Sequence, residues 1–260
     1  MLCLLIHDNL LITANLGDCK AVLFRRDRGY KSNYYKMKNM SDNNLMHMPH
    51  DISFEEGFLD TSSLYSENPL KKMFHYNPIK LSNTHNAAKK KEQIRLRNNF
   101  KDKDIIINTI NASYVKGRLQ PTKSLGDMYL KFKEFNDISI LDAEFKKQAI
   151  SYEEFNGPYI DHIPEITSHI LNEDDEFVVL ATDGLWELLS SREVCEIINE
   201  NNENKLNITD ALRKAALHKA AIKANIKFEE LLKLPKSLKR AVHDDISIMV
   251  VDLKNQVILN

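Results

Sequence analysis

Apolar runs that predict β-strands open the chain. Leu2–Ile6 and Leu10–Ala14 flank the polar pair Asp8-Asn9, a pattern typical of a β-hairpin with a tight turn. Lys20–Phe24 continues the apolar pattern, and we expect it to continue the same sheet. The first 26 residues are therefore predicted to contribute three strands.

Later segments alternate between strand and helix patterns. Further strands are predicted at Ile105–Ile107, Ala112–Val115, Glu165–Ile170 and Phe177–Ala181. Helices are predicted from about Ala87 to Asn98, after Ser190, and over Ile208–Ala224. Ser190 and Glu193 together form a capping-box signature. Strands at both ends with helices between and around them predict an α+β layered sandwich.

Two stretches lack a sustained period. Residues 27–77 are rich in Asn, Ser, Met, Tyr and charge, and we expect a disordered low-complexity insertion there. The insertion divides one domain into residues 1–26 and 78–260. Residues 128–157 are mixed and charged, and we expect low order there as well.

An aspartate ends the most apolar strand. Phe177–Ala181 is continuously apolar, which predicts a strand buried on both faces, and Asp183-Gly184 follows directly. The single Trp186 is expected to anchor the turn. A carboxylate at the end of a rigid strand can hold a metal ion or act as an acid or base. The alternative is that Asp183 caps the following helix.

Two more aspartates precede the last strand. Asp244 and Asp245 lead into Ile246–Leu253, a strongly β-forming run. If this strand lies antiparallel to Phe177–Ala181, Asp183 and Asp244 reach the same sheet edge. Clusters with oxygen ligands alone suit Mg²⁺ or Mn²⁺ better than Zn²⁺.

Four blocks in order resemble the PP2C-type (PPM) metal-dependent Ser/Thr protein phosphatases. They are ANLGDCKAVL from Ala14, LQPTKSLGD from Leu119, LATDGLWE from Leu180 and DDISIMVV from Asp244. The runs Leu81–Ala87 and Leu231–Pro235, together with Gln120-Pro121, are similar to the pyruvate dehydrogenase phosphatase branch. The resemblance implies a PP2C-like β-sandwich flanked by helices.

The resemblance also implies residue roles. It implies that Asp183 and Asp244 are acidic ligands of a two-metal centre, at which a metal-activated water hydrolyses phosphoserine or phosphothreonine in a phosphoprotein substrate. Asp18 matches a position that can help to hold a third ion. Asp127 and Asp245 match secondary or structural positions, as does Lys123, which stands where the family has Arg. The sequence assigns no substrate-binding residue.

One family block is absent from the sequence. The family's N-terminal half carries an Asp-Gly-His-Gly-Gly block with a metal-bridging Asp, but no two of the seven glycines here are adjacent. We therefore expect a partial PP2C-like domain whose N-terminal part is missing and which is nearly inactive on its own. The alternative is a non-catalytic PP2C-like regulatory or interaction module.

Composition narrows the partners and the compartment. A formal net charge of −1 gives no reason to expect a nucleic-acid partner. The apolar start ends at His7, well short of the ~18 residues of a membrane span, so no membrane association is expected. The three cysteines have no paired spacing, which indicates a reducing, intracellular location. With the similarity to the pyruvate dehydrogenase phosphatase branch, this location is expected to be either cytosolic or a mitochondrial-type organelle.

Overall fold

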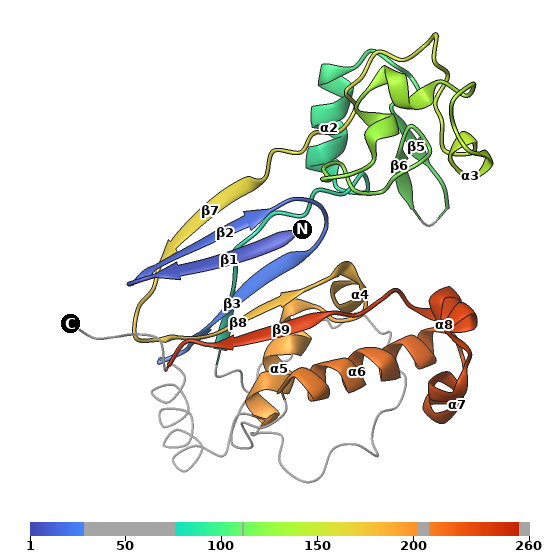
Figure 1. The fold of residues 1–260 in the computed structure, drawn as a ribbon. Coiled ribbons are helices and arrows are strands. Elements are labelled where there is room, and N and C mark those ends of the chain that lie inside the picture. Colours follow the sequence, from blue (N-terminus) through green and yellow to red (C-terminus); the bar gives the residue numbers. More distant parts are fainter. Residues whose placement is uncertain (29–75, 111, 202–207, 255–260) are drawn as a thin grey trace, which may run out of the picture.

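The computed structural model describes residues 1–28, 76–110, 112–201 and 208–254. These residues form a larger lobe of two β-sheets with helices, and a smaller, mainly helical lobe beyond one end of β7 (Figure 1). Both sheets of the larger lobe are antiparallel. The predicted α+β class is confirmed. In the described part of the chain, no helix is both long and apolar enough to cross a bilayer.

The first sheet has the strand order β1-β2-β7. β1 (Leu2–His7) and β2 (Leu10–Asn15) form the predicted hairpin, and β2 also pairs with β7 (Glu165–Ile170). The face that is turned away from the core is mainly apolar and includes the exposed side chains of Leu5, Ile166 and Ile170. Nothing in the described chain covers these three side chains.

The second sheet has the strand order β4-β3-β8-β9. The strands are β4 (Tyr76–Lys80), β3 (Lys20–Arg26), β8 (Asp175–Ala181) and β9 (Ile248–Asp252). The expectation that Lys20–Phe24 continues the first sheet is wrong, because β3 pairs with β4 and β8. Ala21–Phe24 is buried throughout, which suits an inner strand with a second sheet on one side and helices on the other.

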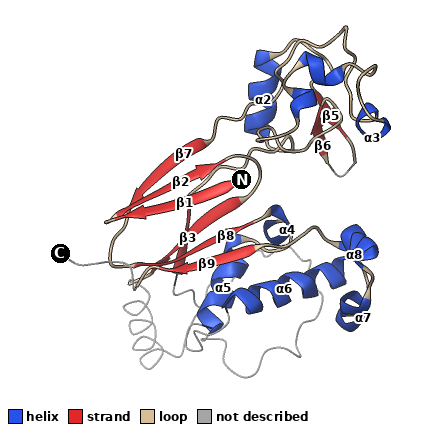
Figure 2. Cartoon of the chain, in the orientation of Figure 1, coloured by secondary structure: helices blue, strands red, loops and turns tan. Residues whose placement is uncertain are grey.

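Apolar layers hold the larger lobe together. Leu11 of β2, Leu23 of β3 and Val178 of β8 meet between the two sheets. On the opposite face of the second sheet, β8 residues pack against α5 (Ser191–Asn201) and α6 (Ile208–Lys223) (Figure 2). Two short helices, α7 (Phe228–Lys233) and α8 (Lys236–Val242), lead back to β9. Every residue of β8 is buried, as its apolar run predicted.

The smaller lobe contains most of the stretch for which low order was expected. Its elements are α2 (Lys90–Asn99), β5 (Ile106–Asn108), β6 (Ser113–Val115), η2 (Met128–Leu130), η3 (Lys133–Asn136) and α3 (Ala143–Lys146). The prediction of low order for 128–157 is wrong. A few anchors organise this stretch: Leu130 and Tyr159 are buried, and Asn136 donates to the carbonyls of Tyr129 and Phe132.

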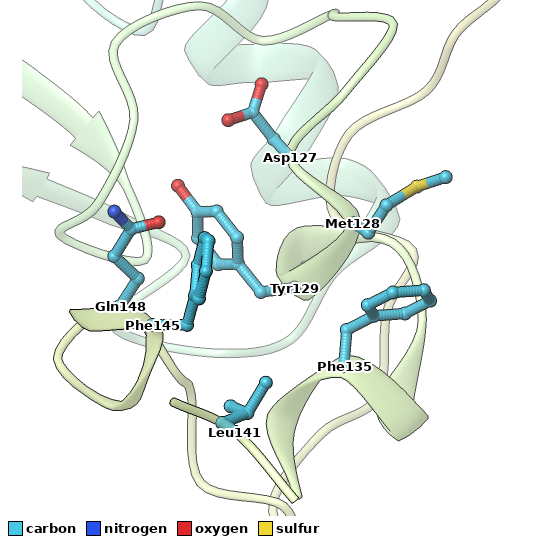
Figure 3. A pocket seen from close by; sticks show the side chains of 7 residues that line it. All are labelled: Asp127, Met128, Tyr129, Phe135, Leu141, Phe145 and Gln148. Atoms are coloured by element: carbon cyan, nitrogen blue, oxygen red, sulfur yellow. The ribbon is translucent and has the colours of Figure 1, made fainter. Parts of the chain in front are cut away.

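The smaller lobe also contains a cavity of about 470 Å³ (Figure 3). Its walls are mostly apolar and come from η2, η3 and α3 with their flanks: Asp127, Met128, Tyr129, Phe135, Leu141, Phe145 and Gln148. Burial raises the pKa of the Tyr129 phenol, and the nearby Asp127 carboxylate raises it further.

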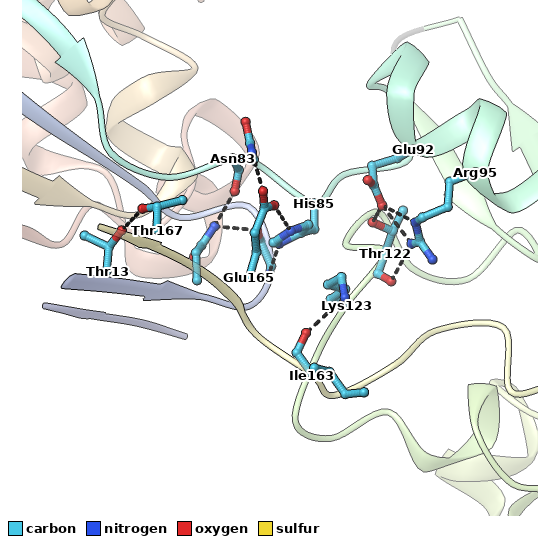
Figure 4. A network of polar contacts seen from close by, with 12 residues as sticks. Thr13, Asn83, His85, Glu92, Arg95, Thr122, Lys123, Ile163, Glu165 and Thr167 are labelled. Atoms are coloured by element: carbon cyan, nitrogen blue, oxygen red, sulfur yellow. Dashed lines mark hydrogen bonds and ion pairs between the residues drawn. The ribbon is translucent and has the colours of Figure 1, made fainter. Parts of the chain in front are cut away.

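Polar side chains connect the two lobes (Figure 4). Buried Glu92 accepts hydrogen bonds from Thr122 (2.6 Å) and Arg95 (2.7 Å), which ties α2 to the segment that follows β6. Nearer the first sheet, buried His85 lies 3.0 Å from the Glu165 carboxylate. These contacts fix the segments that cross between the lobes.

The predicted insertion lies almost entirely outside the described residues, which exclude 29–75. Its predicted end is wrong, because Tyr76 and Asn77 already belong to β4. The Tyr76 ring is buried, and its hydroxyl donates to Glu176 over 2.6 Å. A single buried tyrosine at the edge of a polar, low-complexity stretch produces no periodic pattern, so the start of β4 is not visible in the sequence.

Candidate metal centre

Asp183 occupies the junction between β8 and the short helix α4 (Asp183–Trp186). Its side chain is half-buried, and Oδ1 accepts a hydrogen bond from the Gly184 amide over 2.9 Å. The carboxylate therefore follows a buried strand and also begins a helix. Both sequence-based interpretations of Asp183 are compatible with this position.

Trp186 holds the junction in place. Its Nε1 donates to the carbonyl oxygens of Lys20 (3.1 Å) and Ala181 (3.2 Å), so the indole bridges β3 and β8. The Lys20 ammonium lies 4.5 Å from the centre of the Trp186 ring. These contacts make the turn after β8 a rigid platform for Asp183.

β9 brings Asp244 beside this platform. β8 and β9 pair antiparallel, with Ala181 opposite Ile248, and beyond the last pair Thr182 donates its hydroxyl to the Asp245 carbonyl over 2.9 Å. A Cβ on Gly184 would lie 2.5 Å from the Asp245 carbonyl oxygen and 3.2 Å from that of Asp244. Glycine is required at 184 because the two backbones approach so closely.

The acids around Asp183 repel its charge. Burial raises the pKa of Asp183 to about 6, and the negative charges of Asp18, Asp244 and Glu187 contribute in that order. Asp18 is oriented by Asn86, whose amide donates to Oδ2 over 3.0 Å. Asp18 and Asp244 therefore lie close enough to Asp183 for their charges to act on its carboxylate.

Glu187 was missed by the sequence reasoning. It lies four residues after Asp183 at the C-terminal end of α4, so the two side chains share one helix face. The i,i+4 spacing is visible in the sequence, but it becomes informative only once a helix is known to begin at Asp183.

The acids do not form a ready-made cluster. Among the described residues, no group of three or more His, Cys, Asp or Glu side chains is arranged to hold a metal ion. Asp244 is engaged elsewhere: its Oδ1 lies 3.1 Å from a guanidinium nitrogen of Arg240 and accepts from the Asp245 amide over 2.7 Å.

Asp245 and Lys123, which were expected to have secondary or structural roles, form ion pairs and hydrogen bonds with residues other than Asp183. Asp245 forms an ion pair with Arg240. Lys123 Nζ donates to Asp161 (2.8 Å) and to the Ile163 carbonyl (2.9 Å), which joins two segments at the boundary between the lobes.

Asp127 precedes η2 in a left-handed conformation (φ 56°), and its carbonyl accepts from the Leu130 amide over 2.9 Å. No described residue makes a hydrogen bond or an ion pair with its carboxylate.

Known proteins identify the family. The model of the protein phosphatase 2C family matches residues 74–225. A probable protein phosphatase 2C 38 of Arabidopsis thaliana is 35% identical over 181 residues, covering 69% of this chain and 45% of the relative. The chain belongs to the protein phosphatase 2C family. Asp127, Asp183 and Glu187 lie within the span of the PP2C family model, whereas Asp18 and Asp244 lie outside it.

A second PP2C relative shows a similar identity and coverage. A probable protein phosphatase 2C 72 of Oryza sativa subsp. japonica is 36% identical over 174 residues, covering 66% of this chain and 42% of the relative. The chain therefore spans less than half the length of these curated PP2C relatives. A solved serine-threonine phosphatase 2C from Toxoplasma gondii is 13% identical with a TM-score of 0.45, covering 96% of this chain and 56% of that one.

Proposed function

We propose that this chain is part of a metal-dependent phosphatase that hydrolyses phosphoserine and phosphothreonine in proteins. Membership of the PP2C family supports the reaction class. The observation that carries the proposal is the gathering of Asp18, Asp183 and Asp244 at the end of β8, where burial and mutual repulsion raise the pKa of Asp183 to about 6. Titratable groups with strongly shifted pKa values concentrate at functional sites.

The donor set fits a hard divalent cation. Carboxylate oxygens are preferred by Mg²⁺ and Mn²⁺, and a bound cation would relieve the repulsion that Asp183 experiences. Asp183 and Asp244 would hold the metal, with Asp18 and Glu187 beside them. Because the described acids form no cluster of three, we propose that ligands from outside the described residues complete the centre.

The metal ion and the protein chain would make different contributions to catalysis. When bound, Mg²⁺ or Mn²⁺ supplies an activated water and neutralises phosphate charge. The chain holds the ligands in place: β8 and β9 fix the two main acids at one edge, Gly184 allows their backbones to meet, and Asn86 orients Asp18. Such preorganised charge is the main requirement for phosphoryl transfer.

Finer assignments rest on motifs alone. From motif similarity we place the chain in the pyruvate dehydrogenase phosphatase branch, with a phosphoprotein substrate and an intracellular location, either cytosolic or in a mitochondrial-type organelle. The second candidate function is a non-catalytic PP2C-like regulatory or interaction module. The occupation of Asp244 by Arg240 and the missing third ligand among the described residues favour this alternative.

Completion of the domain tests the proposal. We expect the 260-residue chain with Mn²⁺ to be nearly inactive on a phosphothreonine peptide, and to become active when it is joined to the N-terminal half of a PP2C relative. In the joined protein, Asp183→Asn should abolish turnover, while Asp210→Asn on the distant helix α6 should leave it unchanged. A folded joined protein without activity would favour the interaction module. A fully active bare chain whose rate is unchanged by Asp183→Asn would contradict the proposed site.

A further inference from the structure

Arg240 forms a cationic contact with the candidate metal ligand Asp244. It lies in the last turn of α8, and its guanidinium is 3.1 Å from Asp244 Oδ1 and also pairs with Asp245. On the basis of the proposed function, we propose that Arg240 is an internal cation that occupies Asp244 in the metal-free protein, and that a divalent cation must displace it.

The two candidate ligands differ in how their charge is balanced. Among the described residues, Asp183 has no ion-pair partner, and its charge is opposed by three neighbouring acids. Asp244, by contrast, has Arg240. A metal ion that takes oxygens from both acids therefore competes with the guanidinium for Asp244 alone. Arg240 thereby becomes a determinant of metal affinity without being a ligand.

The exchange requires only movement of a side chain. The backbone on both sides of Asp244 is fixed: the His243 amide donates to the Lys239 carbonyl (3.0 Å), and the Asp245 carbonyl accepts from the Thr182 hydroxyl (2.9 Å). The Arg240 side chain is 60% exposed, so it can rotate into solvent without unfolding α8. Exposed ion pairs are weak and break readily.

Lys239 provides a matched control. It precedes Arg240 in the same helical turn, but its ammonium donates to the carbonyl of Leu232 over 2.9 Å instead of pairing with either acid. Lys239→Gln, like Arg240→Gln, removes one positive charge, but it leaves the Arg240–Asp244 ion pair in place. Comparison of the two variants separates direct competition for Asp244 from a general loss of positive charge.

The test is a calorimetric titration of the chelator-treated chain with Mn²⁺ in 0.15 M KCl. We expect Arg240→Gln to bind Mn²⁺ about 3- to 10-fold more tightly than the wild type, because the variant loses an exposed ion pair and its opposing charge. The Mn²⁺ affinity of Lys239→Gln should stay within about 2-fold of the wild type, because the lost charge contacts neither Asp244 nor Asp245. Arg240→Lys, which keeps the charge, should stay near the wild type.

The outcomes also separate this inference from the function on which it rests. Circular dichroism first shows that each variant is folded. If Asp244→Asn loses Mn²⁺ binding but Arg240→Gln binds no more tightly than wild type or Lys239→Gln, the displacement idea is overturned and the metal site stands. If Asp244→Asn binds Mn²⁺ as well as the wild type, the site is wrong and the role of Arg240 falls with it.

Discussion

Replacing Asp183 by Asn should stabilise the metal-free protein at neutral pH. The carboxylate is held against Asp18, Asp244 and Glu187, and its pKa of about 6 lies well above the ordinary 3.8. At most, this difference corresponds to about 3 kcal/mol of free energy of unfolding. Because the side chain is half-buried, solvent screening reduces it to about 1–2 kcal/mol.

Part of this gain is offset. The Asp183 carboxylate accepts a hydrogen bond from the Gly184 amide in the first turn of α4, and the neutral Asn accepts it less strongly. This loss is worth about 0.5–1 kcal/mol. We therefore expect Asp183→Asn to raise the free energy of unfolding by about 1 kcal/mol at pH 7.5.

The pH dependence has a definite sign. Because its pKa is raised on folding, Asp183 holds its proton more tightly in the folded state. The wild type therefore loses stability as pH rises from about 4 to about 6 and carries the full cost above pH 6. The advantage of Asp183→Asn should be absent near pH 4 and should grow through this window to a plateau.

Urea unfolding in EDTA at pH 4 and pH 7.5 measures the effect. Asp210→Asn is the control, because Asp210 also lies in the first turn of a helix but pairs with Lys214 and Arg213, which lower its pKa. That variant should lose stability at pH 7.5. If Asp183→Asn is destabilised in the same way, Asp183 acts as an ordinary helix-capping carboxylate and the acidic centre is refuted.

Two further predictions concern the supports of the site. Gly184→Ala should lower the free energy of unfolding in urea by about 1–3 kcal/mol and weaken Mn²⁺ binding, because the added Cβ collides with the Asp245 carbonyl. An unchanged free energy of unfolding and an unchanged Mn²⁺ affinity would show that the backbones of Gly184 and Asp245 are not in close contact. Glu92→Ala should cost about 1–3 kcal/mol in urea unfolding, because it leaves the buried Thr122 hydroxyl unpaired. Glu196→Ala, at an exposed position on α5, should unfold at nearly the wild-type urea concentration. Equal unfolding midpoints for the two variants would contradict a stabilising role of the Glu92–Thr122 hydrogen bond.

Local chemistry accounts for what the sequence predicted well. The β1–β2 hairpin is encoded by two apolar runs around a polar pair. The start of α5 is encoded by Ser190 and Glu193, which exchange hydrogen bonds of 2.8 and 3.2 Å. The strand-end position of Asp183 likewise followed from the apolar run before it.

Two of the features that sequence reasoning missed depend on partners that are distant in the sequence. Which sheet includes β3 is decided by pairing with β4 and β8, which are far apart in the sequence. The 128–157 stretch is organised by scattered anchors such as Asn136, which leave no periodic pattern. Glu187 and Arg240 were missed for a different, local reason: each lies four residues from the acid that it affects, and that spacing becomes informative only once the local backbone conformation is known.

The central claim is that Asp183 and Asp244 bind one divalent cation at the β8–β9 edge. Its most direct test is a crystal of the full chain soaked in Mn²⁺, with a difference map from the anomalous scattering of manganese. We expect a peak within about 2.0–2.4 Å of carboxylate oxygens of both residues. Peaks that lie only at other acids, or a fully loaded crystal with no peak at this edge, would contradict the claim.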